Sequence, residues 1–440
     1  MLLLGTCNRQ SAPEGEIWAK TPIIIVTIDT LRADHLGSYG YPRPTSPNLD
    51  RLAQEGVLFE NVVTPISFTL PAHVSLWTSR FPMETGVTSN TKKLDPAAGP
   101  FRFFAKMLAE LGYQTAAFVS ATPVKDATGI ATGFQVWDEP EGKERKGHDT
   151  TARVLSWLDS NPRVPFFLWV HYFDPHDPYR PPNSFKPTLS ADSELVDFLT
   201  AKGLSDPLDP KVLRLNNRYD GEVQFVDSQV GRLIEKLDDL GLLAESTFVV
   251  TSDHGEGLGQ HGMMGHGEIH NEQIFIPLII RFPDSFELHG TRVSQVVSLV
   301  DVVPTLVDIL NLPLQQADRR QFSGNSAYGR RPGGDFTIAQ RVVGKQPEKW
   351  GPGERYALIG SQWKYLFNTA LPDELFDIRD DPGEISNLLE AHPEVAAELR
   401  ERLLSEIARY SAPSGEEVSE ALEEVSPEVL EELRALGYID

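Results

Sequence analysis

Cysteine is almost absent from this chain, with a single residue, Cys7, among 440. One cysteine allows neither an intrachain disulfide nor a metal site built from cysteines. Basic residues are also scarce, because 40 Lys and Arg stand against 63 Asp and Glu and leave a formal net charge of −23. This deficit argues against a nucleic-acid binder and against adhesion to an anionic membrane surface. No apolar run approaches the roughly 18 residues of a membrane-spanning helix.

The remaining composition is that of a globular protein, with 40% hydrophobic and 23% charged residues. Length alone suggests one to three domains. Residues 1–20 form a predicted leader, in which the apolar residues 2–4 lead to Cys7 and polar residues follow. This order resembles the end of a bacterial lipoprotein signal, which would put the protein outside the cytoplasm, periplasmic or secreted, with a lipid on Cys7. The alternative is an apolar N-terminus that carries no lipid.

Residues 21–312 alternate between predicted strands and helices. The continuous apolar run 22–28 is typical of a strand buried on both faces, and Ser46-Pro47 predicts a capped helix start. Further strands are expected at 115–119, 165–173, 246–252 and 276–282, and helices at 101–111, 150–158, 219–240 and 302–310. We therefore expect an α/β fold, in which a large, mostly parallel sheet is sandwiched by helices.

Residues 313–413 have a different texture and predict a smaller C-terminal α+β subdomain. A Gly-, Arg- and Pro-rich stretch, 315–353, indicates a long loop. Residues 356–367 predict a β-hairpin, and 393–410 predict a helix. The last segment, 414–440, is an acidic tail that ends in a helix starting at Ser426-Pro427, with its charged face expected in solvent.

Acidic residues and a histidine end two of the predicted strands. Asp29 directly follows the first strand, and Asp253-His254 follows the strand at 246–252. The carboxyl ends of parallel strands share one edge, where open α/β sheets bind their ligands. Two carboxylates there repel unless a cation lies between them, and carboxylates with an imidazole suit a divalent metal. The alternatives are a turn cap for Asp29 and a flexible Gly/His surface loop for 253–270.

Thr69 marks a second candidate site. Pro71 suits the first turn of a helix that begins beside Thr69, and a helix N-terminus favours an anion. A threonine hydroxyl is a poor nucleophile unless a bound metal lowers its pKa, as a metal does for water. The alternative is that Thr69 is an ordinary N-cap.

Seven stretches carry further information. They are IDTLRADHL at 28–36, TLPAH at 69–73, HYFDPHDPY at 171–179, YDGEV at 219–223, TSDHGE at 251–256, VDVVPTL at 300–306 and ELFD at 374–377. In this order they resemble the sulfatase family of the alkaline-phosphatase-like superfamily, over nearly the whole chain. The resemblance implies a hydrolase of sulfate or phosphate esters, acting on a small molecule, a glycan or a lipid, whose nucleophile binds a divalent metal (Ca, Mg, Mn or Zn).

The resemblance also implies roles for individual residues. The implied metal ligands are Asp29, Thr69, Asp253 and His254, and the implied catalytic residues are Thr69, His73, His176 and His266. His176 and His266 match positions that contact the transferred group or the leaving oxygen. A second metal would have only Asp174 and His176 as a loose candidate site.

Three positions depart from the family pattern. Thr69 stands where sulfatases have the Cys or Ser that is oxidised to formylglycine, and its methyl-bearing carbon cannot yield that aldehyde. His73 replaces the usual Arg, and Thr30 replaces a second metal-binding Asp found in many members. A threonine nucleophile resembles the phosphodiesterase and phosphoglycerol-transferase branches of the superfamily. A binding protein that kept the fold but lost activity is the alternative from another class.

Overall fold

A computed structural model of the chain describes residues 21–94, 101–185, 193–328, 336–342, 351–411 and 422–436. The predicted leader with Cys7 lies outside the described residues, as do parts of the predicted loop 315–353 and of the acidic tail. Within the described ranges, no helix combines the length and the apolar composition of a membrane span.

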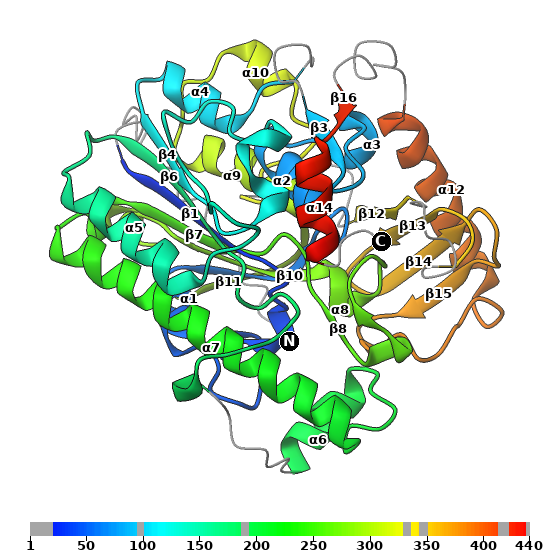
Figure 1. The fold of residues 1–440 in the computed structure, drawn as a ribbon. Helices are drawn as coiled ribbons and strands as arrows, with labels where there is room; N and C mark the ends of the chain where they lie inside the picture. Colours follow the sequence, from blue (N-terminus) through cyan, green and yellow to red (C-terminus); the bar gives the residue numbers. More distant parts are fainter. Residues whose placement is uncertain are drawn as a thin grey trace, which may run out of the picture.

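The centre of the molecule is an eight-stranded sheet in the order β11-β2-β10-β7-β1-β6-β4-β5 (Figure 1). Every neighbouring pair is parallel except the two pairs that β10 makes. The predicted mostly parallel sheet is therefore confirmed. Its strands are β1 (Ile23–Ile28), β2 (Val57–Val63), β4 (Gln114–Phe118), β5 (Val136–Asp138), β6 (Phe166–Tyr172), β7 (Thr247–Thr251), β10 (Phe275–Arg281) and β11 (Thr291–Ser298).

Helices cover both faces of this sheet, because its central strands are apolar on both sides. In β1, Ile23 and Ile25 belong to one core, and Ile24 and Val26 belong to the other. One face packs against α2 (Thr69–Thr78), α4 (Phe104–Glu110) and α9 (Val302–Ile309). The other face packs against α1 (Pro47–Glu55), α5 (Gly147–Asp159) and α7 (Pro210–Asp239), as Figure 1 also shows.

The start of α1 differs from the prediction in its cap. The helix begins at Pro47 as expected, but the Ser46 side chain makes no capping hydrogen bond and donates to Asp50 instead. The backbone N–H groups of Asn48 and Leu49 donate to the Asp227 carboxylate of α7. A long-range partner therefore satisfies the helix end, which local sequence cannot reveal.

The C-terminal subdomain holds a four-stranded antiparallel sheet, β12-β13-β14-β15, with a helix packed on it. The predicted hairpin forms its middle pair, and the predicted helix has the expected bounds. The elements are β12 (Thr337–Arg341), β13 (Arg355–Ile359), β14 (Trp363–Asn368), β15 (Glu374–Asp377) and α12 (Pro393–Tyr410). The smaller α+β unit expected after the large sheet is therefore present.

The last described segment returns to the main body of the protein. Strand β16 (Leu422–Glu424) pairs with β3 (Lys92–Leu94), and α14 (Pro427–Ala435) follows. Ser426 caps α14, as predicted, by accepting from the N–H of Val429. The Glu432 carboxylate accepts from Lys125 and Thr122 at 2.7 Å each. One face of α14 is thus docked, while Glu428 and Glu431 face solvent.

Candidate active site

The ends of two neighbouring strands bring polar side chains together at the carboxyl edge of the main sheet. Asp29 follows β1, and Asp253 and His254 follow the neighbouring strand β7. One potential ligand atom from each of the three lies within 4.8 Å of the others. All three side chains are at most 1% exposed. The structure therefore brings together the three residues that the strand ends predicted.

The two carboxylates suit a cation. Neither oxygen of Asp29 and only one oxygen of Asp253 has a hydrogen-bond donor among the described residues. Burial, followed by repulsion from Asp253 and Glu256, raises the pKa of Asp29 well above its usual value, and burial also raises the pKa of Asp253. The Thr69 hydroxyl beside Asp29 has the opposite effect and lowers the pKa of that carboxyl group. A buried pair of this kind is stable as carboxylates only with positive charge between them, so the donor set fits a divalent ion.

The hydrogen bonds of His254 orient its ring for such an ion. Its Nδ1 lies 3.0 Å from the Gly255 carbonyl oxygen, so Nδ1–H donates there. The lone pair of Nε2 then points to the Thr69 hydroxyl, 3.4 Å away, and toward Asp253, 3.6 Å away. A histidine whose other nitrogen donates to a carbonyl is the usual arrangement of a metal ligand. Burial lowers the pKa of His254 to about 3, which keeps the ring neutral.

Thr69 is the first residue of α2, and its hydroxyl faces the carboxylates. The N-cap position belongs to Phe68, and no side chain caps this helix end. The interpretation of Thr69 as an ordinary N-cap is therefore wrong. The next backbone N–H, from Leu70, donates to Asn90 at 2.8 Å. The Thr69 hydroxyl lies at the edge of the sheet, 3.4 Å from His254 Nε2.

His73 lies one helical turn after Thr69 and is held by a chain of hydrogen bonds. Trp169 Nε1–H donates to Thr27 Oγ1 at 2.9 Å, and the Thr27 hydroxyl donates to His73 Nε2 at 3.0 Å. His73 Nδ1–H then donates to the Thr69 carbonyl oxygen at 2.8 Å. Both ring nitrogens of His73 are thus engaged, and the ring fixes the backbone of Thr69.

His176 and His266 lie together on the outer side of His254. Their Nε2 atoms are 3.3 Å apart, and the rings of His266 and His254 are 4.2 Å apart between centroids. His176 Nδ1 contacts the Asp177 carbonyl, while His266 Nδ1 contacts the Ser67 carbonyl. Phe173 stacks on His176 at 4.4 Å between centroids. Three histidines therefore form a row that leads outward from Thr69.

His171 was missed by the sequence reasoning. It is the last residue but one of β6, the other neighbour of β1, and its Nε2 lies 3.5 Å from Asp29 Oδ2. His171 also forms a potential ligand cluster with His73 and Asp253. Neither ring nitrogen has a hydrogen-bond partner within the described ranges, although the side chain is fully buried. The signal was available, because the rule that neighbouring strand ends converge applies to β6 as it does to β7.

A network of hydrogen bonds fixes the loop after Asp29. Thr30 has the left-handed φ of 55°, which is uncommon for a β-branched residue. Its N–H donates to Asp253 Oδ1 at 3.2 Å. The Tyr219 hydroxyl donates to the Thr30 carbonyl at 2.7 Å and accepts from the Arg32 N–H at 2.9 Å. Tyr219, from α7, thus fixes the loop that follows Asp29, and the Thr30 N–H links that loop to Asp253.

A comparison with known protein families shows the family of this chain. The Sulfatase family model matches residues 21–312. This chain belongs to the sulfatase family. It is 25% identical to arylsulfatase K of Bos taurus, an alignment that covers 89% of this chain and 82% of that protein. Among solved structures, this chain resembles the phosphonate monoester hydrolase of Agrobacterium radiobacter, with a TM-score of 0.74 and 21% sequence identity. The match covers 89% of this chain and 96% of that hydrolase.

A second solved structure has the same fold. BT4656, in complex with its substrate D-glucosamine-2-N,6-O-disulfate, has a TM-score of 0.74 and 20% identity, and the match covers 91% of the sulfatase chain and 99% of BT4656. At these identities the structural likeness establishes the alkaline-phosphatase-like fold expected from the sequence. It does not transfer a substrate.

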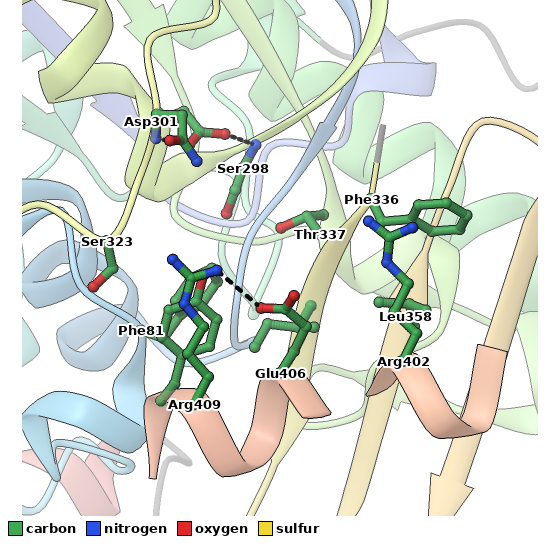
Figure 2. Close-up of a pocket in the computed structure, with 13 residues that line it drawn as sticks. Phe81, Ser298, Asp301, Ser323, Phe336, Thr337, Leu358, Arg402, Glu406 and Arg409 are labelled. Atoms are coloured by element: carbon green, nitrogen blue, oxygen red, sulfur yellow. Dashed lines mark hydrogen bonds and ion pairs between the residues drawn. The ribbon is translucent and has the colours of Figure 1, made fainter. Parts of the chain in front are cut away.

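Two cavities of this protein lie apart from Thr69. One of them, of about 120 Å³, lies between the main body and α12 and is lined by Phe81, Phe336 and Arg402 among others (Figure 2). Its acidic side chains are paired, since Glu406 lies 3.6 Å from Arg409 and Asp301 accepts from the Ser298 N–H. The other, of about 380 Å³, is lined by residues that include Arg32, Asp34 and Lys202. Neither is lined by the residues grouped around Thr69.

Asp174 does not join His176 in a metal cluster. No three-ligand cluster among the described residues includes Asp174. Its carboxylate packs against Gly147, where a β-carbon would come within 2.6 Å of Oδ2, and lies 3.8 Å from Lys146 Nζ. The second-metal candidate considered from the sequence therefore lacks support.

Proposed function

We propose that this protein hydrolyses sulfate or phosphate esters, with the Thr69 hydroxyl as the nucleophile. The observation that carries the proposal is the meeting of that hydroxyl with two donor-poor buried carboxylates and a neutral imidazole at one sheet edge. Ester cleavage of this kind needs an activated oxygen beside a centre of positive charge, and a metal ion held by this group would supply that charge.

Asp29, Asp253, His254 and Thr69 would hold a divalent metal ion. Such an ion, when bound, lowers the pKa of a ligating oxygen and stabilises the negative charge of the ester oxygens. Calcium, magnesium, manganese and zinc all accept carboxylate ligands, and the single imidazole leaves the choice among them open. His73 positions Thr69 by fixing its backbone, and Tyr219 positions Asp29 by fixing the loop that follows it.

The proposed reaction has two steps. In the first, the Thr69 hydroxyl passes its proton to the His176–His266 pair as Oγ attacks the sulfur or phosphorus, the bond to the alcohol oxygen breaks, and the pair delivers the proton to that leaving oxygen. In the second, water attacks the group on Thr69, which releases sulfate or phosphate and restores the hydroxyl. Burial and His266 lower the pKa of His176 to about 3, and an anionic ester in the pocket would raise it, because negative charge favours the imidazolium.

This route does without formylglycine. A threonine carries a methyl group on its hydroxyl carbon, so it cannot be converted to that aldehyde, and the only cysteine is at position 7. The likeness to arylsulfatase K supports a sulfate ester, and the sulfated sugar bound by BT4656 makes a sulfated glycan a reasonable substrate class to test. The likeness to a phosphonate monoester hydrolase supports the alternative, a phosphodiesterase or a phosphoglycerol-type transferase that passes the group to an alcohol.

A substrate panel tests the proposal. Aryl sulfate, aryl phosphate monoester and aryl phosphate diester are each assayed with Ca²⁺, Mg²⁺, Mn²⁺ and Zn²⁺, with Asp253→Asn as the control that disables the site. The proposal predicts metal-dependent turnover of at least one ester that Asp253→Asn abolishes. Absence of turnover across the panel, together with metal binding, would favour an inactive binding protein. Adding an alcohol acceptor to the best substrate separates hydrolysis from transfer.

The proposed place of action is outside the cytoplasm, with Cys7 as the site of lipid attachment. This part rests on the order of residues around Cys7 alone. Metabolic labelling with a fatty-acid probe tests it, since the label should be lost in Cys7→Ser and retained in Thr69→Ala.

A further inference from the structure

A second group of metal-type side chains lies away from the Thr69 site. His261 comes from the turn between β8 (Gly257–Leu258) and β9 (Met264–Gly265), and His270 directly precedes α8 (Asn271–Ile274). Glu384 follows β15 in the C-terminal subdomain. One potential ligand atom from each of these three residues lies within 4.8 Å of the others. None of them takes part in the proposed ester hydrolysis.

The ring of His261 is already oriented by a carboxylate. Its Nδ1 lies 3.1 Å from Glu272 Oε1, so Nδ1–H donates to Glu272 and the lone pair of Nε2 remains for another partner. A carboxylate that accepts from one ring nitrogen while the other binds a metal is a recurrent arrangement in metalloproteins.

The other two side chains are held close together with unused capacity. His270 Nδ1 is buried without a hydrogen-bond partner in the described part of the chain, and it lies 3.6 Å from Glu384 Oε2. The Lys364 ammonium fixes the far oxygen, Glu384 Oε1, at 2.6 Å and also donates to the Ile269 carbonyl. The N–H of Asn271 donates to Glu384 Oε2 at 2.6 Å. Glu384 is therefore fixed with one oxygen toward His270.

We propose that His261, His270 and Glu384 bind one zinc ion, at a site separate from the Thr69 site. Two imidazole nitrogens and one carboxylate oxygen suit zinc and its first-row neighbours, whereas calcium and magnesium prefer oxygen ligands throughout. The rings of His261 and His270 are stacked, 3.9 Å between centroids and 15° between planes. Their nitrogens must converge on one ion, so the stack opens on binding. His261 is the ring that turns, because its side chain is 20% exposed and it follows Gly259, which has a positive φ.

An ion at this site would connect two parts of the structure. His266 lies on the same segment as His261 and His270, and several glycines of that segment have positive φ, namely Gly259, Gly262, Gly265 and Gly267. Glu384 and Lys364 belong to the C-terminal subdomain. An ion bound by both sides would therefore tie the segment that carries His266 to the C-terminal sheet.

Metal counting on the full-length protein tests the site. The protein is loaded with Zn²⁺, dialysed and analysed for metal, and Co²⁺ is titrated in parallel to follow the absorption of a site with nitrogen ligands. The variants are His261→Ala and His270→Ala, and the control is His289→Ala, an exposed histidine that donates to the Glu55 carbonyl elsewhere on the surface. Every variant is also made in an Asp253→Asn background, which removes zinc held at the Thr69 site.

The expected result is that Asp253→Asn alone, and Asp253→Asn combined with His289→Ala, each retain one equivalent of zinc. Combining Asp253→Asn with His261→Ala or with His270→Ala should remove both that zinc and the cobalt absorption. Circular dichroism and melting curves establish that the variants fold, and His261→Gln, which keeps a polar side chain facing Glu272, provides a milder replacement that should also lose the ion. Equal zinc content in His261→Ala, His270→Ala and the control would overturn the proposal. Because the Asp253→Asn background isolates this site, failure here leaves the proposed hydrolysis untouched, and the reverse also holds.

Discussion

Replacing Tyr219 with Phe removes one buried oxygen and probes how the two carboxylates are held. The hydroxyl makes two hydrogen bonds, to the Thr30 carbonyl at 2.7 Å and from the Arg32 N–H at 2.9 Å. At about 1 kcal/mol for each bond, the free energy of unfolding should fall by about 2 kcal/mol. Without this clamp, Thr30 can leave its left-handed conformation, φ 55°, which is strained for a β-branched residue. Asp29 and Asp253 should then lose their shared geometry.

The expected effect on metal binding is a loss of about 10- to 100-fold in affinity, the range found when groups that orient metal ligands are removed. Isothermal titration with the ion that supports activity measures it directly. The control is Tyr172→Phe, which removes another buried hydroxyl, bonded to Thr151 at 2.8 Å and not to the loops of the site. That variant should lose stability but keep its metal affinity. Wild-type affinity in Tyr219→Phe would refute the reasoning and leave Tyr219 with a packing role only.

Three further predictions concern buried titratable side chains. Asp29→Asn should raise the melting temperature of the metal-free protein, because it removes one of two buried carboxylates, and should abolish the stabilisation that added metal gives; a lower metal-free melting temperature would contradict this. Although burial opposes ionisation, Lys364 and His270 hold the pKa of Glu384 well below its usual value, so its contribution to stability is present above about pH 4.3 and is lost as the pH falls. Glu384→Gln should therefore cost about 3–5 kcal/mol at pH 7 in urea unfolding and flatten the acid side of the stability profile; an unchanged profile would count against the pairing. His176→Ala should lower kcat by about 10²–10⁴-fold, more for alkyl than for aryl esters, and equal losses for both would remove His176 from leaving-group protonation.

The main sheet was predictable where its strands are continuous apolar runs. The runs that became β1 and β6 lie at the centre of the sheet and are buried on both faces, so composition alone identified them. Strands β2 and β11 were not predicted. β2 carries Glu60 and Asn61 within its span, and β11 begins with exposed polar residues at the sheet edge, so neither has the pattern of a buried strand.

The candidate site was predictable to the extent that strand ends define it. Asp29 and Asp253 follow apolar strands, and the shared edge of parallel strands accounts for their meeting. The hydrogen bond from Tyr219 to Thr30 could not be predicted, because the two residues are 189 positions apart in the sequence. It depends on where α7 crosses the edge of the sheet. The engagement of His73 with Thr27 likewise depends on the packing of α2 against β1.

The role of Thr69 is the central claim, and its replacement by Ala tests that claim most directly. The hydroxyl caps no helix, so Thr69→Ala should change the melting temperature little. With the best ester of the panel, the account predicts that kcat/KM falls by about 10⁴-fold or more in Thr69→Ala, whereas Thr69→Ser retains measurable turnover. An alanine variant that keeps most of the activity of the wild type would mean that water attacks the ester directly, and would contradict the account.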